Sequence, residues 1–199
     1  MLELSPQLKY YYDKSLEAFQ KSHFDYAIEM SKAVIKQAPH YVPAYRVIYQ
    51  SAFNLDKQKS CNAVQIFSKQ MTAFYFRILG NICLLKKNIS ASQWNFVQGL
   101  LERPRDKGML TGWLELSMKQ GWLDIAIIPA EALCEINPKQ VENYLLLSNL
   151  YLQKGTADSA KSIIQQGLRI LPTDPQLTRR LKEIEAERTM QRGDWGGKN

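Results

Sequence analysis

The sequence has few of the side chains that carry enzyme chemistry. Only two of its 199 residues are histidines, His23 and His40. Neither histidine combines with a cysteine or carboxylate and a second histidine at metal-ligand spacing, which argues against a zinc site. Neither Gly-x-x-x-x-Gly-Lys-Ser/Thr nor Gly-x-Gly-x-x-Gly occurs, so the usual phosphate-binding loops are absent. We therefore expect no enzymatic activity, no cofactor and no metal.

Cysteine is also sparse, and long apolar runs are missing. Cys61, Cys83 and Cys134 are scattered and form no Cys-x-x-Cys pair, which suits a reducing compartment better than a disulfide framework. The N-terminus has no basic segment followed by an apolar run, so no signal peptide is predicted. The most apolar stretch, residues 71–85, is interrupted by Arg77 and is too short to cross a bilayer. These features predict a cytoplasmic protein without a transmembrane segment.

What the sequence does contain is a repeat of 34 residues. Four classes of position keep this interval: Pro104, Pro138 and Pro172; Ser92, Ala126 and Ala160; Gly121 and Gly155; and Leu79, Trp113 and Leu147. Within each unit, apolar residues recur at three- and four-residue steps, and a polar or glycine break lies midway. Each unit is therefore predicted to be two helices joined by a tight turn and closed by a proline.

This pattern resembles the tetratricopeptide repeat (TPR) family, most clearly in residues 73–174. The unit 141–174 carries Tyr144, Leu147, Ser148, Tyr151, Ala160 and Pro172, and the unit 73–106 carries Phe76, Leu79, Gly80, Phe96 and Pro104. The unit 107–140 is looser, and the unit 8–41 matches through Tyr11, Ser15, Phe24, Ala27 and Pro39. The resemblance implies an all-α, right-handed superhelical solenoid of antiparallel helix pairs.

Two segments depart from the regular unit. A degenerate unit is predicted for 42–72, with Pro43 at the start of its first helix and a second helix near 61–70 that lacks the closing proline. An irregular connector there is the alternative. A C-terminal capping helix is predicted for 175–189, and 190–199 is expected to be a disordered tail. The sequence thus predicts one domain over 1–189.

The resemblance also indicates which side chains would line the inner groove of such an array. Carried over by position, the leading candidates are Phe74, Arg77, Ile78, Asn81, Leu84, Leu85, Leu145, Leu146, Asn149 and Leu152. Apolar anchors with two asparagines suit a helix or an apolar peptide laid in a groove. The same residues would alternatively contact neighbouring helices, the end helix or a second copy of the chain.

One subtype of the family binds a C-terminal carboxylate of heat-shock chaperones through lysine, asparagine and arginine side chains. Arg77 and Asn81 occupy the first two of these positions, but Gly112, Glu142 and Leu146 occupy later ones. A glutamate there would repel the carboxylate of the ligand, so this mode of binding is rejected.

The net charge of +7 is concentrated in the middle of the chain. Between residues 54 and 107 there are nine basic and three acidic side chains. The predicted basic patch comprises Lys57, Lys59, Lys86, Lys87, Arg103, Arg105 and Lys107. Such a patch would attract acidic protein segments or an anionic surface. No base-reading motif accompanies it, which argues against nucleic-acid binding.

Together these patterns predict a non-enzymatic scaffold or adaptor. Its partner would be another protein with an apolar or acidic segment. Two alternatives stay open at this point: a self-assembling, homo-oligomeric protein, and a binder of anionic surfaces or nucleic acid through residues 54–107.

Overall fold

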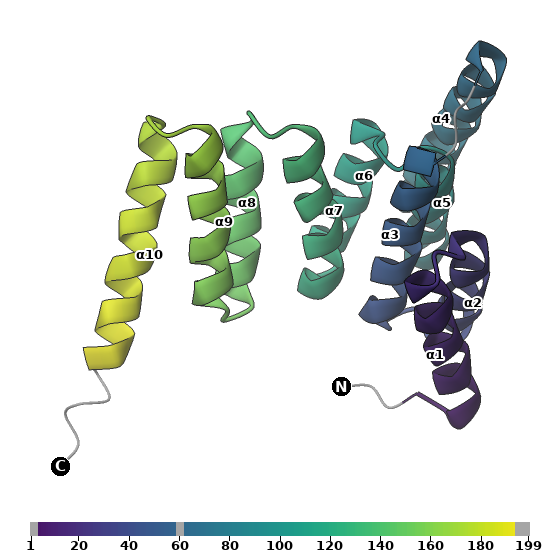
Figure 1. Cartoon of the computed structure of the whole chain (residues 1–199), viewed down its shortest axis with the longest axis horizontal. Coiled ribbons are helices and arrows are strands. Elements are labelled where there is room, and N and C mark those ends of the chain that lie inside the picture. The colour runs from purple at the N-terminus through teal and green to yellow at the C-terminus, as the bar shows by residue number, and fades with distance from the viewer. Residues whose placement is uncertain (1–3, 59–61, 194–199) are drawn as a thin grey trace. The chain divides into compact units, whose positions relative to one another are not determined.

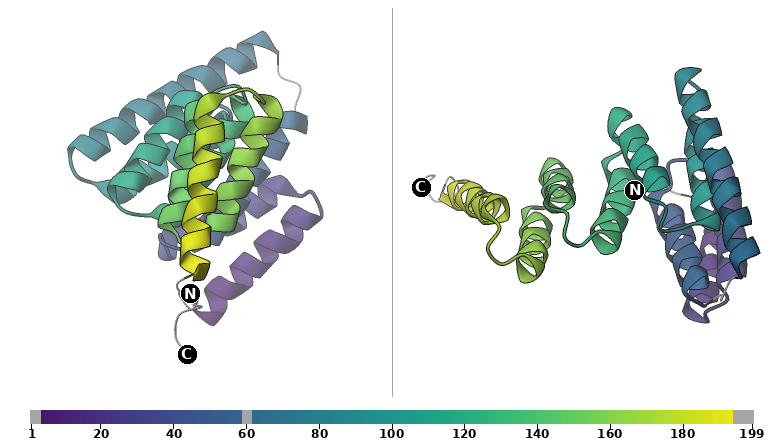
Figure 2. Two further views of the ribbon diagram at one scale, coloured as in Figure 1. Left: turned by 90° about the vertical axis from the view of Figure 1, so that its left-hand side faces the viewer. Right: turned by 90° about the horizontal axis from the view of Figure 1, so that it is seen from above.

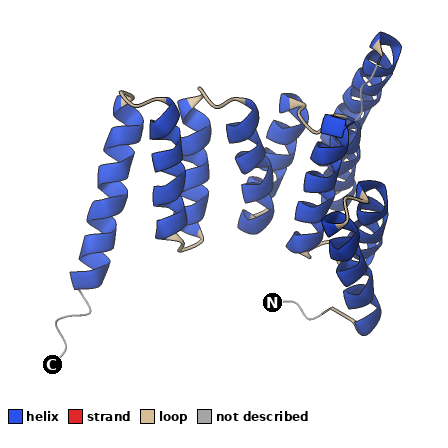
Figure 3. Ribbon diagram, in the orientation of Figure 1, coloured by secondary structure: helices blue, strands red, loops and turns tan. Residues whose placement is uncertain are grey.

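The computed structural model describes residues 4–58 and 62–193, which form helices and no strands (Figure 3). The helices are α1 (Pro6–Gln20), α2 (Phe24–Gln37), α3 (Val42–Gln58), α4 (Ala63–Leu85), α5 (Ile89–Glu102), α6 (Lys107–Lys119), α7 (Leu123–Ile136), α8 (Val141–Gln153), α9 (Ala157–Ile170) and α10 (Pro175–Gly193). The chain divides into two compact units, 1–116 and 117–199, with the boundary inside α6. The single domain that the sequence predicts over 1–189 stays a prediction beside this division into two units.

In the first unit, α1, α2 and α3 pack on one another around small residues (Figure 1). Ala18, Ala27 and Val47 form a buried cluster at their contact, because short side chains let the helices approach closely. The Tyr45 hydroxyl donates a 2.8 Å hydrogen bond to the Pro39 carbonyl, which fixes the start of α3 against the turn before it.

Helix α5 packs against α3, although thirty residues separate the end of one from the start of the other. Tyr45 and Ile48 of α3 face Val97 and Leu100 of α5 across a small apolar gap. The Tyr49 hydroxyl donates a 3.2 Å hydrogen bond to the carbonyl of Pro104, just beyond α5. Helix α5, and not a separate helix near 61–70, therefore packs against α3 in the described residues.

Helix α4 is a correction to the expected repeat. Residues 63–72 and 73–85 form one continuous helix, so there is no separate helix near 61–70 and no turn before 73. Asn62 begins it with a capping box, accepting from the Gln65 amide and donating to the Gln65 side chain. No proline occurs in the helix and its first glycine is Gly80, so nothing in the sequence stops it at residue 72.

Phe96 of α5 lies between two glycines on neighbouring helices. A Cβ added at Gly80 of α4 would lie 3.1 Å from the Phe96 ring, and one at Gly112 of α6 would lie 2.6 Å from it. Both glycines therefore make room for one fully buried aromatic side chain.

The Gly112→Ala variant is expected to have a free energy of unfolding about 1–3 kcal/mol lower than that of the Gly108→Ala variant. Both variants gain helix propensity in α6, but only the first drives a methyl group into the rigid Phe96 ring. A methyl group at Gly108 meets the flexible end of Arg77, which can move aside. Urea denaturation followed by circular dichroism measures the difference, and equal stabilities would contradict this packing.

The second unit consists of the end of α6 and helices α7 to α10. The Tyr144 hydroxyl donates a 3.1 Å hydrogen bond to the Pro138 carbonyl, with the same six-residue spacing as the Tyr45 bond in the first unit. Gly155 ends α8 with a φ of +79°, a conformation that disfavours other residues. A Cβ at Gly167 would lie 3.0 Å from both Tyr144 and Leu177, so this glycine allows α8, α9 and α10 to meet.

The C-terminal helix α10 begins at Pro175 as predicted and extends four residues beyond the expected end. The Asp174 carboxylate caps it by accepting from the Leu177 amide at 2.9 Å. Leu177 and Ile184 are completely buried against the unit. Residues 190–193 were predicted to belong to a disordered tail but are helical, and the rest of that prediction, 194–199, lies outside the described residues.

Candidate protein-interaction surfaces

The first six predicted groove residues lie along α4, in the first unit. Phe74, Ile78, Asn81 and Leu85 are exposed, and Leu85 keeps 84% of its surface accessible. Arg77 and Leu84 are half-buried, and the Arg77 guanidinium lies 5.2 Å from the centre of the Phe74 ring. The structure therefore leaves the apolar part of this predicted surface open within the unit.

The exposed face of α4 also includes residues that the sequence prediction missed. Val64 and Phe67 are 77% and 64% exposed, and Met71, Tyr75 and Ile82 are exposed as well. Seven exposed residues of the helix share one face and form what we call the α4 stripe: Val64, Phe67, Met71, Phe74, Ile78, Asn81 and Leu85. Its members are spaced alternately by three and four residues. That spacing runs across residues 72 and 73, and it is the signal that could have revealed one helix instead of two.

The α4 stripe faces away from α5. Ala73 and Gly80, which contact the rest of the unit, are buried. Two residues along a helix correspond to a rotation of about 200°, so Met71 and Ala73 point to nearly opposite sides. Figure 1 shows that the beginning of α4 extends past the ends of its neighbours in the first unit. One face of α4 thus builds the unit, and the other remains uncovered in it.

The α4 stripe is larger than the usual apolar patch on a soluble protein. At about 200 Å² for a large apolar side chain, the exposed fractions of the six apolar members of the stripe amount to roughly 700 Å². The largest apolar patch on a typical monomer is about 300–600 Å², and larger patches mark interaction sites.

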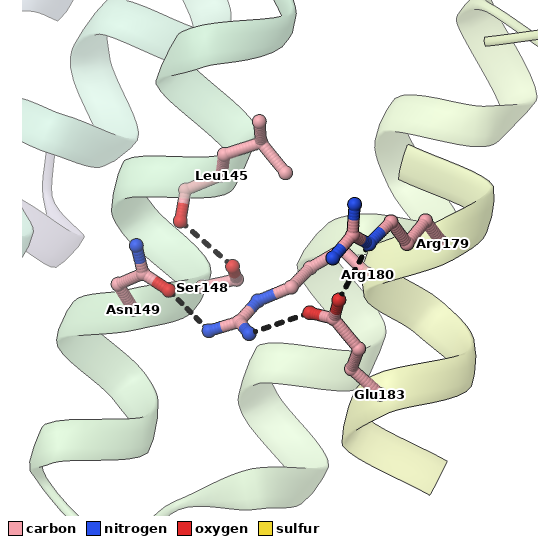
Figure 4. A network of polar contacts seen from close by, with 6 residues as sticks. All are labelled: Leu145, Ser148, Asn149, Arg179, Arg180 and Glu183. Carbon is pink, nitrogen blue, oxygen red and sulfur yellow. Dashed lines mark hydrogen bonds and ion pairs between the residues drawn. The ribbon is translucent and has the colours of Figure 1, made fainter. Parts of the chain in front are cut away.

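The other four predicted groove residues lie on α8, in the second unit. Leu145, Leu146 and Leu152 are half-buried, and Asn149 is exposed. Figure 4 shows Arg180 of α10 reaching α8, where it donates a hydrogen bond to the Asn149 side-chain oxygen. Asn149 therefore contacts the end helix, which was one of the alternatives left open by the sequence.

Glu183 holds Arg180 in this position. Its carboxylate accepts from Arg180 at 3.0 Å and from Arg179 at 2.9 Å. These two hydrogen bonds lower the pKa of Glu183. The Ser148 hydroxyl turns away from this network and donates to the Leu145 carbonyl of its own helix.

The predicted basic residues do not form one patch in the first unit. Lys57 and Arg105 both lie over the ring of Phe53, at 4.4 and 4.8 Å from its centre. Lys86 and Lys87 lie in the turn before α5, about 20 Å away along that 14-residue helix. Arg103 forms a 3.7 Å ion pair with Asp106, Lys107 is exposed, and Lys59 lies outside the described residues.

A cleft of about 320 Å³ opens between α2, α3, α4 and α5. Its charged lining comprises Asp25, Glu29, Asp56, Glu102, Lys32 and Lys69. Sequence reasoning missed it because its walls come from four different helices, and the period within one helix does not show which side chains of its neighbours it meets. Acidic and basic side chains are mixed in its lining.

Among residues 4–58 and 62–193, no three His, Cys, Asp or Glu side chains gather in a way that could hold a metal ion. No described helix combines the length and apolar character needed to cross a membrane.

No protein-family model matches the sequence, and comparison with curated proteins gives no match. Solved structures do resemble it. The structure of Naa15/Naa10 bound to HypK-THB has a TM-score of 0.51 at 12% identity, covering 92% of this chain and 29% of that chain. The first TPR of Spaghetti (RPAP3) bound to the HSP90 peptide SRMEEVD has a TM-score of 0.45 at 13% identity, covering 60% of this chain and 94% of that chain.

YrrB, described as a TPR protein with an unusual peptide-binding site, is similar at a TM-score of 0.43 and 14% identity, covering 87% of this chain and 90% of that chain. At these identities the likeness bears on the fold alone.

Proposed function

Because the chain has the all-α fold of tetratricopeptide repeat proteins, we propose that it is a non-enzymatic scaffold or adaptor that binds other polypeptides through apolar surfaces of its helices. The observation that carries this proposal is the uncovered apolar face of α4. An exposed apolar face of this size promotes aggregation unless another polypeptide covers it. We also propose that the protein is cytoplasmic, because its three scattered cysteines suit a reducing compartment.

The mechanism is burial of apolar area, with a few polar groups that fix orientation. At about 25 cal/mol per Å², covering roughly 700 Å² contributes about 18 kcal/mol in gross terms. Association costs about 4–15 kcal/mol and side-chain ordering costs more, so the affinity depends on how well the bound segment packs against the stripe. Asn81 would satisfy polar groups of the bound segment, and Lys86 and Lys87, next to Leu85, would steer acidic partners.

The α8 residues form the second proposed surface. Leu145, Leu146 and Leu152 are half-buried and so offer less area than α4. An apolar peptide would bind there beside the Asn149–Arg180 contact. With one surface in each unit, the protein would hold two polypeptides together, which is the work of an adaptor.

The Leu145→Glu, Leu146→Glu double variant is expected to lose a partner that the wild-type protein captures from its source cell. Two carboxylates on α8 would oppose burial of an apolar segment. Affinity capture with quantitative mass spectrometry measures the loss. Ile170→Glu is the matched control, because Ile170 is a 41% exposed apolar residue of α9 in the same unit. Unchanged capture by a folded double variant would refute the α8 surface.

Self-assembly is the second candidate function, and the size of the α4 stripe favours it. The two candidates are compatible, because a chain paired through α4 would keep α8 available.

A further inference from the structure

We propose that the α4 stripe is covered by the α4 stripe of a second copy of this chain, so that the protein is a homodimer joined by two helices. The inference rests on the proposed function of α4 as a protein-binding surface and names the polypeptide that binds there. It is carried by the periodicity, the area and the charge of the stripe.

The periodicity of the α4 stripe is that of a helix–helix seam. Positions 64, 71, 78 and 85 recur every seven residues, and so do positions 67, 74 and 81. Seven-residue spacing of two apolar positions is the pattern by which two helices pack along their length. All seven side chains are exposed, so the whole seam is uncovered within the first unit. Helix α4 therefore exposes, along its whole length, an apolar surface suited to packing against a second helix.

The area of the stripe is the area that a dimer needs. The roughly 700 Å² of the stripe lies close to the contribution of one partner to a standard stable interface, which is about 800 Å². A twofold interface uses the same patch on both chains, so a second copy would cover the stripe with an equal area.

The charge on α4 also favours a second copy over an unrelated partner. The helix has no acidic residue, and its only charged side chains, Lys69 and Arg77, lie outside the stripe. Lys69 lines the cleft on the α5 side, and Arg77 lies over the ring of Phe74 in its own chain. Pairing two identical stripes therefore brings no like charges together along residues 63–85, and Lys86 and Lys87 lie beyond the last residue of the seam. A charged partner helix would find no row of opposite charge beside the stripe.

Asn81 would specify the register of the two helices in the dimer. A single asparagine in an apolar seam specifies alignment and number of helices at a cost in stability. In a parallel pair, Asn81 would meet Asn81 of the second copy. The second copy would approach from the side opposite α5, where the start of α4 stands clear of the neighbouring helices of its unit (Figure 2).

The test is the mass of the full-length protein in solution, by sedimentation velocity over roughly 1 to 100 µM, a range that brackets dimers of ordinary affinity. The wild-type protein is expected at twice the chain mass of 23.0 kDa. The Phe67→Glu, Met71→Glu variant is expected at the mass of one chain. Ile66→Glu is the matched control, because Ile66 is 50% exposed on the same helix but lies off the stripe, and it should remain dimeric.

A second variant keeps the test decisive if the double glutamate variant unfolds. Asn81→Leu adds an apolar group to an exposed position and is expected to tighten association, shifting the dimer to lower concentrations. A monomeric wild type, equal dissociation of Ile66→Glu, or an Asn81→Leu variant that associates no more tightly would overturn the inference. A monomeric wild type that loses a captured protein on Phe67→Glu, Met71→Glu substitution would refute the dimer while leaving the proposed function intact.

Discussion

Phe96→Ala is expected to lower the free energy of unfolding by about 3–5 kcal/mol, a large part of the stability of a domain of this size. Phe96 is fully buried, and Gly80 and Gly112 border its ring from two helices. Neither glycine has a side chain that could move into the space left by the ring. The cavity would therefore stay largely open, and α4, α5 and α6 would all lose their common contact. Urea denaturation followed by far-ultraviolet circular dichroism measures the change.

Trp94→Ala is the control for this variant. Trp94 lies two residues earlier on α5 but is 37% exposed, so its removal takes a large aromatic group from the surface and leaves no closed cavity. We expect a loss of about 1 kcal/mol or less. If the two variants were equally destabilised, Phe96 would not be the packing centre of α4, α5 and α6.

Stability is expected to fall steeply at alkaline pH because of Cys134. Burial, together with the smaller effect of the neighbouring Glu131 and Glu135 carboxylates, raises the pKa of its thiol from 9.0 to about 12. Below pH 9 the thiol is protonated in both the folded and unfolded chains and contributes no pH dependence. As the pH rises above 9, only the unfolded chain releases the proton, so the folded state is disfavoured by about 1.4 kcal/mol per pH unit up to about pH 12.

Cys134→Ala isolates this contribution. Chemical denaturation of the wild type and the variant at pH 8, 9, 10 and 11 gives the slope of stability against pH for each, and the variant should be the less steep. Tyr45 contributes in the same direction and remains in both proteins, because burial raises the pKa of its hydroxyl. Parallel slopes for the two proteins would show that the Cys134 thiol ionises as readily in the folded chain as in the unfolded chain.

The repeat itself could be predicted from the sequence because its signals are local. Pro138 and Pro172 mark the ends of helices, Gly121 and Gly155 take the left-handed turn conformation, and Asp174 caps the helix that follows it. Each of these acts on its own few residues, whatever the rest of the chain does. Helix pairs, turns and the capping helix therefore follow from residue type and spacing.

The prediction of a separate helix within residues 61–72 was wrong. It placed a degenerate repeat unit in a segment that lacks the closing proline of the other units. The capping box at Asn62 and the absence of proline between residues 63 and 85 favour one long helix. These local signals were present in the sequence, but the expectation of another repeat outweighed them.

What the sequence by itself determined is which side chains share a face of each helix, because the helical period alone sets that. Phe74, Ile78 and Leu85 belong to one face of α4 however the chain folds. Only the tertiary structure decided which faces are covered. Helix α5 covers Ala73 and leaves Phe67 open, and Arg180 of α10 reaches Asn149 on α8. These outcomes depend on contacts between segments far apart in the chain, and periodicity within one helix carries no information about its neighbours.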